Sequence, residues 1–270
     1  MVLCSVIIPS FNHARFIRHT VESVLSQQRP GLELEVLVMD GGSTDDTATI
    51  LRPYLDRITF VSEKDRGQSH AINKGFARAR GELVTWLCSD DCYEPDGLGM
   101  LLDAMQSDPD AVMVYGAVLQ VDEDNRIFGL HPALRPPSTH ELLKDYTYIQ
   151  QAGSLLRGAR LREVGFLDEN LHYAMDLDLW LRMLKDHHGL ALPGRAVARA
   201  RYHAEAKTLA GAAAMADESM RVRWRHGAPL VGGATWEYAR WRFVNLPLQP
   251  VRQRVRRLLR LTGSPSNFPP

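Results

Sequence analysis

Carboxylates gather at two places where an apolar segment of this 270-residue chain stops. The segment 83–88 runs into Ser89-Asp90-Asp91, and the segment 34–39 runs into an acidic, glycine-containing turn at 40–46. Clustered carboxylates repel one another and bury nothing apolar, so they cost folding free energy. Oxygen ligands of this kind suit Mg²⁺ or Mn²⁺, and such a cation could join the protein to a phosphate.

The adjacent pair Asp90-Asp91 could divide two tasks between its members. Neighbouring side chains of an extended chain point in opposite directions, so one carboxylate can face a ribose while the other binds a cation. That cation would bridge diphosphate oxygens and neutralise charge on a departing nucleoside diphosphate. The alternative is a solvated helix start, where the helix dipole favours acids, and the dipeptide alone favours this alternative.

Two earlier acids also lie at turns. Asp40 could accept a hydrogen bond from a nucleotide base or a ribose, or it could simply form a turn that caps the next helix. Asp65 comes before a predicted helix, and Gly67 would let the backbone there approach a phosphate closely. Here too the alternative is a cap and a turn.

A later helix carries Asp176 and Asp178 near its start. Residues two apart on a helix point in different directions, so one acid can face a cleft as a general base. The other can cap the helix or pair with Arg182, four residues beyond Asp178. The alternative is that both merely complement the helix dipole. His203 could ligate a metal or contact a phosphate, although a lone histidine usually does neither.

Strands and helices alternate over residues 1–121, and they would position these side chains. Ser43 and Asp46 predict a capping-box-like helix start, and Gly81 predicts a helix end. The alternation predicts a Rossmann-like, mostly parallel sheet with helices on both faces. In such sheets ligands bind at the carboxyl ends of the strands. The predicted strands are 6–8, 34–39, 58–62, 83–88 and 112–121, the last as a strand pair or an edge strand; the predicted helices are 14–28, 43–55, 67–80 and 95–107.

The second half is less regular. Residues 122–148 predict loops with a short helix at 138–145, followed by a strand at 150–157, a helix at 175–187 and a strand at 197–202. We expect a domain at 1–210, with a nucleotide-binding half at 1–121 and an acceptor half at 122–210. An arginine-rich helical extension at 211–262 and a disordered tail at 263–270 would follow.

A formal net charge of zero hides a basic arm at residues 221–260. This arm has ten arginines and one acid, Glu237, for a net charge of +9, and the rest of the chain carries −9. Tryptophans lie among the arginines, which suggests helices lying on an anionic membrane surface and suits a lipid-linked acceptor. The alternative is a packed helix with a solvated arginine face. Nucleic acid is not an expected partner, because no nucleic-acid module accompanies the arginines.

Cysteine usage and hydropathy predict the compartment. Three cysteines are too few for a disulfide framework. No apolar stretch approaches the roughly 18–20 residues of a membrane span, and the N-terminus enters a strand without a signal peptide. These features predict a cytoplasmic protein, which the basic arm could hold at the inner face of the cell membrane. The sequence leaves a homo-oligomer open.

Several motifs, each weak alone, occur in one order. They are Val6-Ile7-Ile8-Pro9-Ser10-Phe11-Asn12, Val38-Met39-Asp40-Gly41-Gly42-Ser43-Thr44-Asp45, Glu63-Lys64-Asp65-Arg66-Gly67-Gln68, Ala71-Ile72-Asn73-Lys74-Gly75 and Trp86-Leu87-Cys88-Ser89-Asp90-Asp91. Together they closely resemble the family-2 glycosyltransferases of the GT-A fold. The match extends through 150–152, 164–169 and 175–182, and it covers roughly residues 4–210.

The resemblance implies an inverting transferase that uses a nucleotide-sugar, expected to be a UDP-sugar, and Mn²⁺ or Mg²⁺. The acceptor would be a hydroxyl of a glycan or a lipid-linked molecule in surface polysaccharide or glycoconjugate synthesis. Asp40 would read the base, and Asp90 would hold the ribose side. The residues implied to border the nucleotide are Pro9, Phe11, Asn12, Asp40, Asp65, Gly67 and Asp90.

The same resemblance implies the metal and catalytic roles. Asp91 would ligate the metal, and His203 would touch the metal or the diphosphate. Asp176 would act as general base on the acceptor hydroxyl. Gln151 and Trp180 would line the acceptor or sugar pocket.

Two residues depart from the family pattern. Cys88 stands where Asn or Asp is commoner, and Met175 stands where many relatives carry Glu. A catalytically silent nucleotide-sugar-binding or scaffold protein on the same fold is the main alternative. A nucleotidyltransferase is another, but such enzymes normally carry a Gly- and Lys/Arg-rich phosphate loop where this chain has Pro9-Ser10-Phe11-Asn12.

Overall fold

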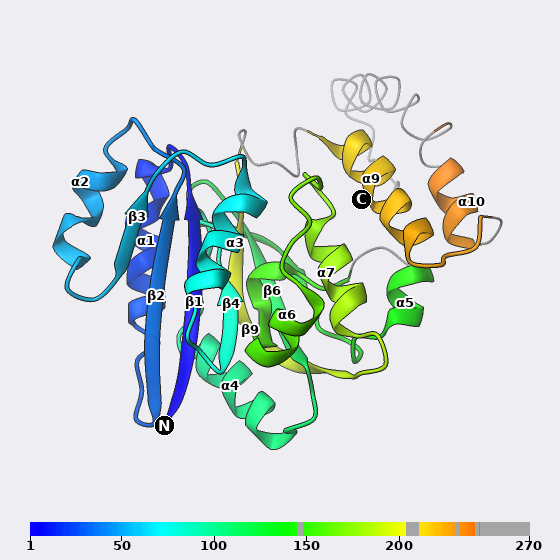
Figure 1. Ribbon diagram of the computed structural model, residues 1–270, viewed down its shortest axis with the longest axis horizontal. Coiled ribbons are helices and arrows are strands. Elements are labelled where there is room, and N and C mark those ends of the chain that lie inside the picture. The colour runs from blue at the N-terminus through cyan, green and yellow to red at the C-terminus, as the bar shows by residue number, and fades with distance from the viewer. Residues whose placement is uncertain (145–147, 204–210, 231–232, 241–242, 244–270) are drawn as a thin grey trace, which may run out of the picture.

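A single nine-stranded sheet organises the computed structural model, which describes residues 1–144, 148–203, 211–230, 233–240 and 243 (Figure 1). The strands are β1 (Val2–Ser10), β2 (Leu32–Asp40), β3 (Thr59–Ser62), β4 (Leu83–Trp86), β5 (Cys92–Tyr93), β6 (Met113–Asp122), β7 (Ile127–His131), β8 (Ser154–Arg157) and β9 (Gly189–Tyr202). Their order is β3-β2-β1-β4-β8-β6-β9-β5, and β7 pairs with β6.

Helices cover both faces of this sheet (Figure 1). They are α1 (Ala14–Leu25), α2 (Thr47–Leu51), α3 (Gln68–Arg78), α4 (Gly97–Ser107), α5 (Thr139–Lys144), α6 (Gly158–Val164), α7 (Met175–Met183), α9 (Ala212–Arg225) and α10 (Gly233–Arg240), with 3₁₀ turns η1 (Arg52–Tyr54) and η2 (Gln151–Gly153).

The first half of the sheet is parallel, as the alternating pattern predicted. β1 pairs in parallel with β2 and β4, and β2 pairs in parallel with β3. Beyond β4 the sheet is mixed, because β8 enters antiparallel between β4 and β6, while β6 and β9 run parallel. The carboxyl ends of β1, β2 and β4 therefore meet at one edge.

Strand β1 shows why the sheet is so apolar. Its side chains alternate between two cores, with Val6 and Ile8 packed in the cluster that includes α1 and α4, and Ile7 packed in the cluster that includes α3 and α7. All three are fully buried. A strand covered on both faces reads as a continuous apolar run rather than an alternating one.

The second half departs from the prediction in two strands. β6 is an interior strand with neighbours β8, β9 and β7, so the prediction of an edge strand or strand pair at 112–121 was wrong. β7 lies in the segment predicted as loop. Its side chains Ile127, Phe128 and Leu130 are exposed. β7 therefore lacks the alternation of buried and exposed residues by which a strand is recognised in a sequence.

Two predicted helix boundaries were also wrong. Ser43 does not cap a helix, since α2 begins at Thr47 and its backbone N–H bonds to the carboxylate of Asp45. Gly81 does not end α3, which stops at Arg78. The N–H of Gly81 instead donates to the hydroxyl of Ser5 at 2.8 Å.

The extension after residue 210 is helical where it is described. α9 packs against α7, and α10 contacts α5 and α9 (Figure 1). Arg223 is buried and donates to the carbonyl of Leu142, while Arg225 donates to Asp168. These arginines follow the packed-helix alternative. Residues 231–232, 241–242 and 244–260 of the basic arm and the predicted disordered tail lie outside the described residues. Within the described chain, no helix combines the length and apolarity needed to cross a membrane.

Candidate active site

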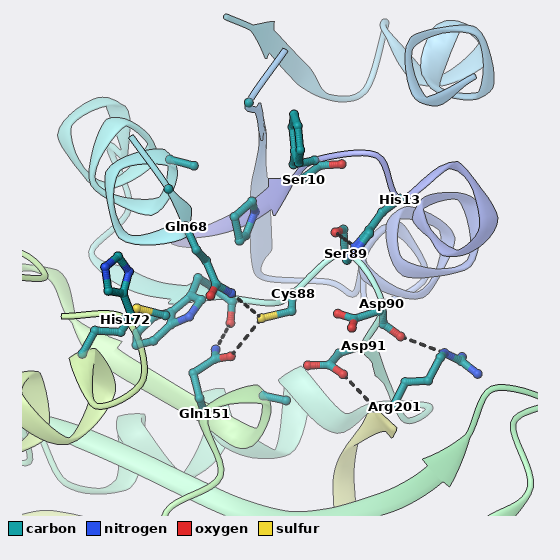
Figure 2. Close-up of a pocket in the computed structure, with 18 of the residues that line it drawn as sticks. Ser10, His13, Gln68, Cys88, Ser89, Asp90, Asp91, Gln151, His172 and Arg201 are labelled. Atoms are coloured by element: carbon teal, nitrogen blue, oxygen red, sulfur yellow. Dashed lines mark hydrogen bonds between the residues drawn. The ribbon is translucent and has the colours of Figure 1, made fainter. Parts of the chain in front are cut away.

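A cavity of about 930 Å³ opens where the carboxyl ends of β1, β2 and β4 meet the end of β9 and the start of α7. Figure 2 shows side chains from these elements facing one space. Its lining comes from residues far apart in the sequence, drawn from the segments 9–13, 41–44, 64–71, 86–91, 150–152, 172–176 and 200–203 and from Met215.

One end of the cavity is shaped by Phe11, Gly41 and Asp65. A Cβ added to Gly41 would lie 2.5 Å from a carboxylate oxygen of Asp65 and 3.3 Å from the Phe11 ring. Only glycine therefore lets the three approach one another. Asp65 also accepts a hydrogen bond from the N–H of Gly67, which has φ of +120°, a conformation that favours glycine. Pro9, Phe11, Asp65 and Gly67, which were predicted to border the nucleotide, all line the cavity; their contact with a nucleotide stays a prediction.

Asp40 and Asn12 lie next to this end of the cavity but outside its lining. Asp40 is buried, and its carboxylate accepts hydrogen bonds from the N–H groups of Gly42 and Ser43 and from the hydroxyls of Ser43 and Ser62. Asn12 accepts from the N–H of Thr44. Both side chains build the turn that carries Gly41 rather than line the cavity. The contacts of Asp40 follow the turn-forming alternative, and its contact with a base stays a prediction.

Asp90 and Asp91 lie on the floor of the cavity, directly after β4 (Figure 2). His203, at the end of β9, places its Nε2 atom 2.9 Å from Oδ2 of Asp90. The backbone N–H of Arg201 donates to Asp91, and the Arg201 guanidinium donates to the carbonyl of Asp90. Hydrogen bonds from the end of β9 therefore hold Asp90 and Asp91 in place.

This acidic cluster fits a divalent cation. Oxygen atoms of Asp90 and Asp91 and the Sγ of Cys88 all lie within 4.8 Å of one another. Burial and the charge of Asp90 raise the pKa of Asp91 well above its usual range. Two repelling carboxylates in a buried place destabilise the fold, and a bound cation would remove that cost. The contact between His203 and Asp90 leaves the histidine beside this cluster, and its role as a ligand stays a prediction.

The thiol of Cys88 joins a small polar network (Figure 2). Gln68 donates to its sulfur at 3.3 Å, and the thiol lies 3.7 Å from Oε1 of Gln151. Gln151 in turn donates to the carbonyl of Trp86. Gln151, the first residue of η2, thus lines the cavity as predicted and is held against β4.

Asp176 and Asp178 point in different directions from α7. Asp176 lines the cavity, and burial raises its pKa to about 6. Asp178 faces the protein, where its carboxylate contacts Arg182 at 2.8 Å and His226 at 2.8 Å. Although burial acts to raise it, these hydrogen bonds and charges hold the pKa of Asp178 below its usual value. The predicted division between a cleft-facing acid and a paired acid is confirmed.

Trp180 was wrongly predicted to line the pocket. It is fully buried and stacks on Trp86, with ring centroids 5.4 Å apart. Trp86 is the tryptophan that lines the cavity. Sequence reasoning missed Arg201 and Tyr173 as lining residues. The period of two along a strand places Arg201 on the same face as His203 and could have found it.

Comparison with known proteins agrees with this geometry. A model of the family described as glycosyl transferase family 2 matches residues 5–160. The chain belongs to this family. An uncharacterized glycosyltransferase of Rickettsia typhi is 29% identical over 192 residues, and chondroitin synthase of Escherichia coli is 30% identical over 184 residues. This family-2 glycosyltransferase spans 59% of the first relative and 26% of the second, and the matches take up 68% and 67% of its own chain.

Solved structures share the fold at low sequence identity. Residues 1–349 of S. aureus TarS, in complex with UDP-GlcNAc, have a TM-score of 0.69 and 18% identity, covering 90% of this chain and 73% of that one. The mannosyltransferase PcManGT of Pyrobaculum calidifontis, in complex with GDP-Man and Mn²⁺, has a TM-score of 0.68 and 20% identity, covering 97% and 76%. The predicted GT-A fold is confirmed for this family-2 glycosyltransferase.

Proposed function

We propose that this protein transfers a sugar from a nucleotide-sugar to an acceptor hydroxyl, with inversion at the anomeric carbon. A UDP-sugar is the first candidate donor, and the candidate acceptor is a glycan or lipid-linked molecule of surface polysaccharide or glycoconjugate synthesis. The observation that carries the proposal is the placement of Asp176 on the same cavity as Asp90 and Asp91. A direct displacement needs a base near the acceptor hydroxyl and a group that neutralises the leaving diphosphate. Both must face the same cavity.

In this mechanism the exposed ring of Phe11 stacks on the nucleotide base, and Asp65 lies beside it. Asp90 and Asp91 would hold the divalent cation, with Cys88 and His203 in reach. When bound, the cation neutralises charge on the leaving diphosphate.

Asp176 takes the proton of the acceptor hydroxyl as that oxygen attacks the anomeric carbon. The C–O bond to the acceptor forms as the bond to the diphosphate breaks on the opposite side. The raised pKa of Asp176, about 6, suits a base that must be ionised near neutral pH yet accept a proton in the transition state.

Donor binding tests the proposal first. Thermal unfolding is measured with Mn²⁺ and with UDP-GlcNAc, GDP-mannose or a dTDP-sugar, and then with each nucleotide-sugar and no cation. A ligand at 100 times its Kd stabilises the native state by about 2.7 kcal/mol, or roughly 5–10 °C at this size. We expect such a shift with one donor and its dependence on Mn²⁺. The absence of a shift with all three donors would contradict the proposal.

A catalytically silent binding protein is the alternative, and turnover separates the two. The transferase releases nucleoside diphosphate from the donor that gives the thermal shift, whereas a silent protein binds the donor and leaves it intact. Retention of the acceptor-side carboxylate Asp176 beside the acidic cluster favours the transferase.

We also propose that the arm holds the enzyme on an anionic membrane surface. Trp236 and Phe243 are exposed by 69% and 68%. Residues 231–260, which follow the packed arginines of α9, hold seven arginines and one acid, and this net charge of +6 supports an acidic partner. We expect binding to phosphatidylserine-containing vesicles that salt weakens and that truncation after residue 230, which removes Trp236 and Phe243, reduces at least tenfold. Phosphatidylcholine vesicles are the control. Equal binding by the truncated chain would contradict the assignment.

A further inference from the structure

Glu218, from the middle of α9, reaches the start of the helix that carries Asp176. Its Oε1 atom accepts hydrogen bonds from the backbone N–H groups of Tyr173 and Ala174, at 2.8 and 2.9 Å. Asp176 is the second residue of α7, which begins at Met175. Glu218 is only 5% exposed, so these bonds lie out of bulk water.

The start of α7 lacks the usual local partners for these N–H groups. The first N–H groups of a helix have no partner within it, and the capping residue here, Ala174, has no side-chain acceptor. An acid at the third helical position can bond back to the capping N–H. That position is Leu177, which is buried in the apolar core. Glu218 supplies the missing acceptor from a different helix.

α9 contacts this region at further points. A Cβ added to Gly211, just before α9, would lie 2.3 Å from the hydroxyl oxygen of Tyr173, so the chain passes directly against that ring. At the other end of α9, His226 contacts Asp178. Residues 211–226 therefore contact the chain both before and after Asp176. All of α9 lies beyond residues 5–160, where the family match ends.

We propose that Glu218 is a positioning residue for Asp176, acting through the backbone of Tyr173 and Ala174 to hold the start of α7 against the cavity. The inference rests on the proposed role of Asp176 as the base. Under this proposal α9 positions the catalytic base, although Glu218 itself does not line the cavity.

Glu218 also acts through its charge. Burial is the main cause that raises the pKa of Asp176, and backbone hydrogen bonds, chiefly from the N–H of Leu177, oppose it. Two residues of α9 make smaller contributions: the charge of Arg223 lowers this pKa, and the charge of Glu218 raises it. His172, Lys64 and Asp65 line the same cavity from the other elements around it, together with the acidic cluster. Loss of the negative charge of Glu218 should therefore lower the pKa of Asp176.

The test compares Glu218→Gln, Glu218→Ala and the control Asp217→Asn. The glutamine side chain of the first variant keeps an acceptor oxygen and loses only the charge. Asp217 is an acid of the same helix that bonds to Tyr238 instead. Amide hydrogen exchange over residues 171–177 is measured without any ligand, and hydrolysis of UDP-GlcNAc or GDP-mannose with Mn²⁺ is followed from pH 5 to 8.

We expect Glu218→Ala to raise exchange at the amides of Tyr173 and Ala174 at least tenfold and to lower kcat at least tenfold, with the KM for the donor within twofold. Glu218→Gln should keep exchange and kcat at pH 8 within about threefold and move the acid limb of kcat to lower pH. Asp217→Asn should change none of these.

Unchanged exchange at both amides in Glu218→Ala would overturn the inference, and so would an unchanged kcat while Asp176→Asn is inactive. If Asp176→Asn stays active, the proposed function fails instead, and the exchange result still reports on Glu218. Should Glu218→Ala not fold, Glu218→Asp, whose side chain is one methylene shorter, takes its place in the exchange measurement, and unchanged exchange at both amides contradicts the inference.

Discussion

Replacing Asp176 by Asn should make the protein more stable and less active at the same time. Burial raises the pKa of this carboxyl from its ordinary 3.8 to about 6, which corresponds to about 3 kcal/mol against the charged form. Because folding raises this pKa, the folded protein binds the proton more tightly than the unfolded chain. Above pH 6 the folded state carries the cost of the charge, and below pH 3.8 neither state does.

Partial exposure of Asp176 to the cavity reduces this figure, so we expect Asp176→Asn to raise the free energy of unfolding by about 1–3 kcal/mol at pH 8. The difference should shrink through pH 6 and approach zero below pH 4. Turnover should fall by about 10²-fold or more, as for loss of a general base. Donor binding should persist.

Urea unfolding followed by tryptophan fluorescence, at several pH values between 4 and 8, measures this difference. Asp178→Asn is the matched control, two residues along the same helix. The pKa of Asp178 is held low, so its contribution to stability is present above its ordinary pKa and is lost as the pH falls. That variant should be less stable at pH 8. A stability of Asp176→Asn equal to the wild type at every pH would refute the reasoning.

Three further changes probe the cavity. Asp91→Asn should remove the Mn²⁺-dependent part of nucleoside diphosphate binding, measured by calorimetry; equal affinities with and without Mn²⁺ in the wild type would contradict the metal role. Phe11→Ala should weaken donor binding by about 1–3 kcal/mol, the usual worth of stacking on a base, and Phe11→Tyr should restore it; wild-type affinity in Phe11→Ala would rule out stacking. Gly41→Ala should push Asp65 and Phe11 apart, since its Cβ would lie 2.5 Å from the Asp65 carboxylate, and should weaken donor binding at least tenfold. Gly31→Ala is the control, because Gly31 lies outside the cavity lining. Its φ of +82° makes an alanine there costly for stability, but donor binding by the folded variant should be unchanged.

Residues 1–121 were largely predictable from the sequence because β1, β4 and the second half of β2 are buried on both faces. Val6 to Ile8 forms a short, continuous apolar run, which is the pattern expected of a strand covered on both faces. β9 was not predictable over its full length, since its first part contains Pro193-Gly194, a pair typical of a turn. Only its last part, 197–202, has a strand-like pattern. β8 was expected as a strand, but its antiparallel insertion between β4 and β6 depends on long-range pairing that no local pattern encodes.

The acidic site was predictable for a related reason. Asp90, Asp91 and Asp176 lie at a strand end and a helix start, and such positions converge in this kind of sheet. Trp180 could not be placed, because α7 is buried around most of its circumference and periodicity then does not tell one face from another. Glu218 carried no signal, since its partners are backbone N–H groups more than forty residues away.

The anomeric configuration of the sugar released when water replaces the acceptor tests the proposed mechanism most directly. The protein is incubated with Mn²⁺ and an α-linked donor, UDP-GlcNAc or GDP-mannose, and the first product is observed by proton NMR before it mutarotates. We predict the β-anomer from the wild type and its loss, by about 10²-fold or more, in Asp176→Asn. Release of the α-anomer, or an undiminished rate in Asp176→Asn, would contradict the assignment of an inverting transferase with Asp176 as its base.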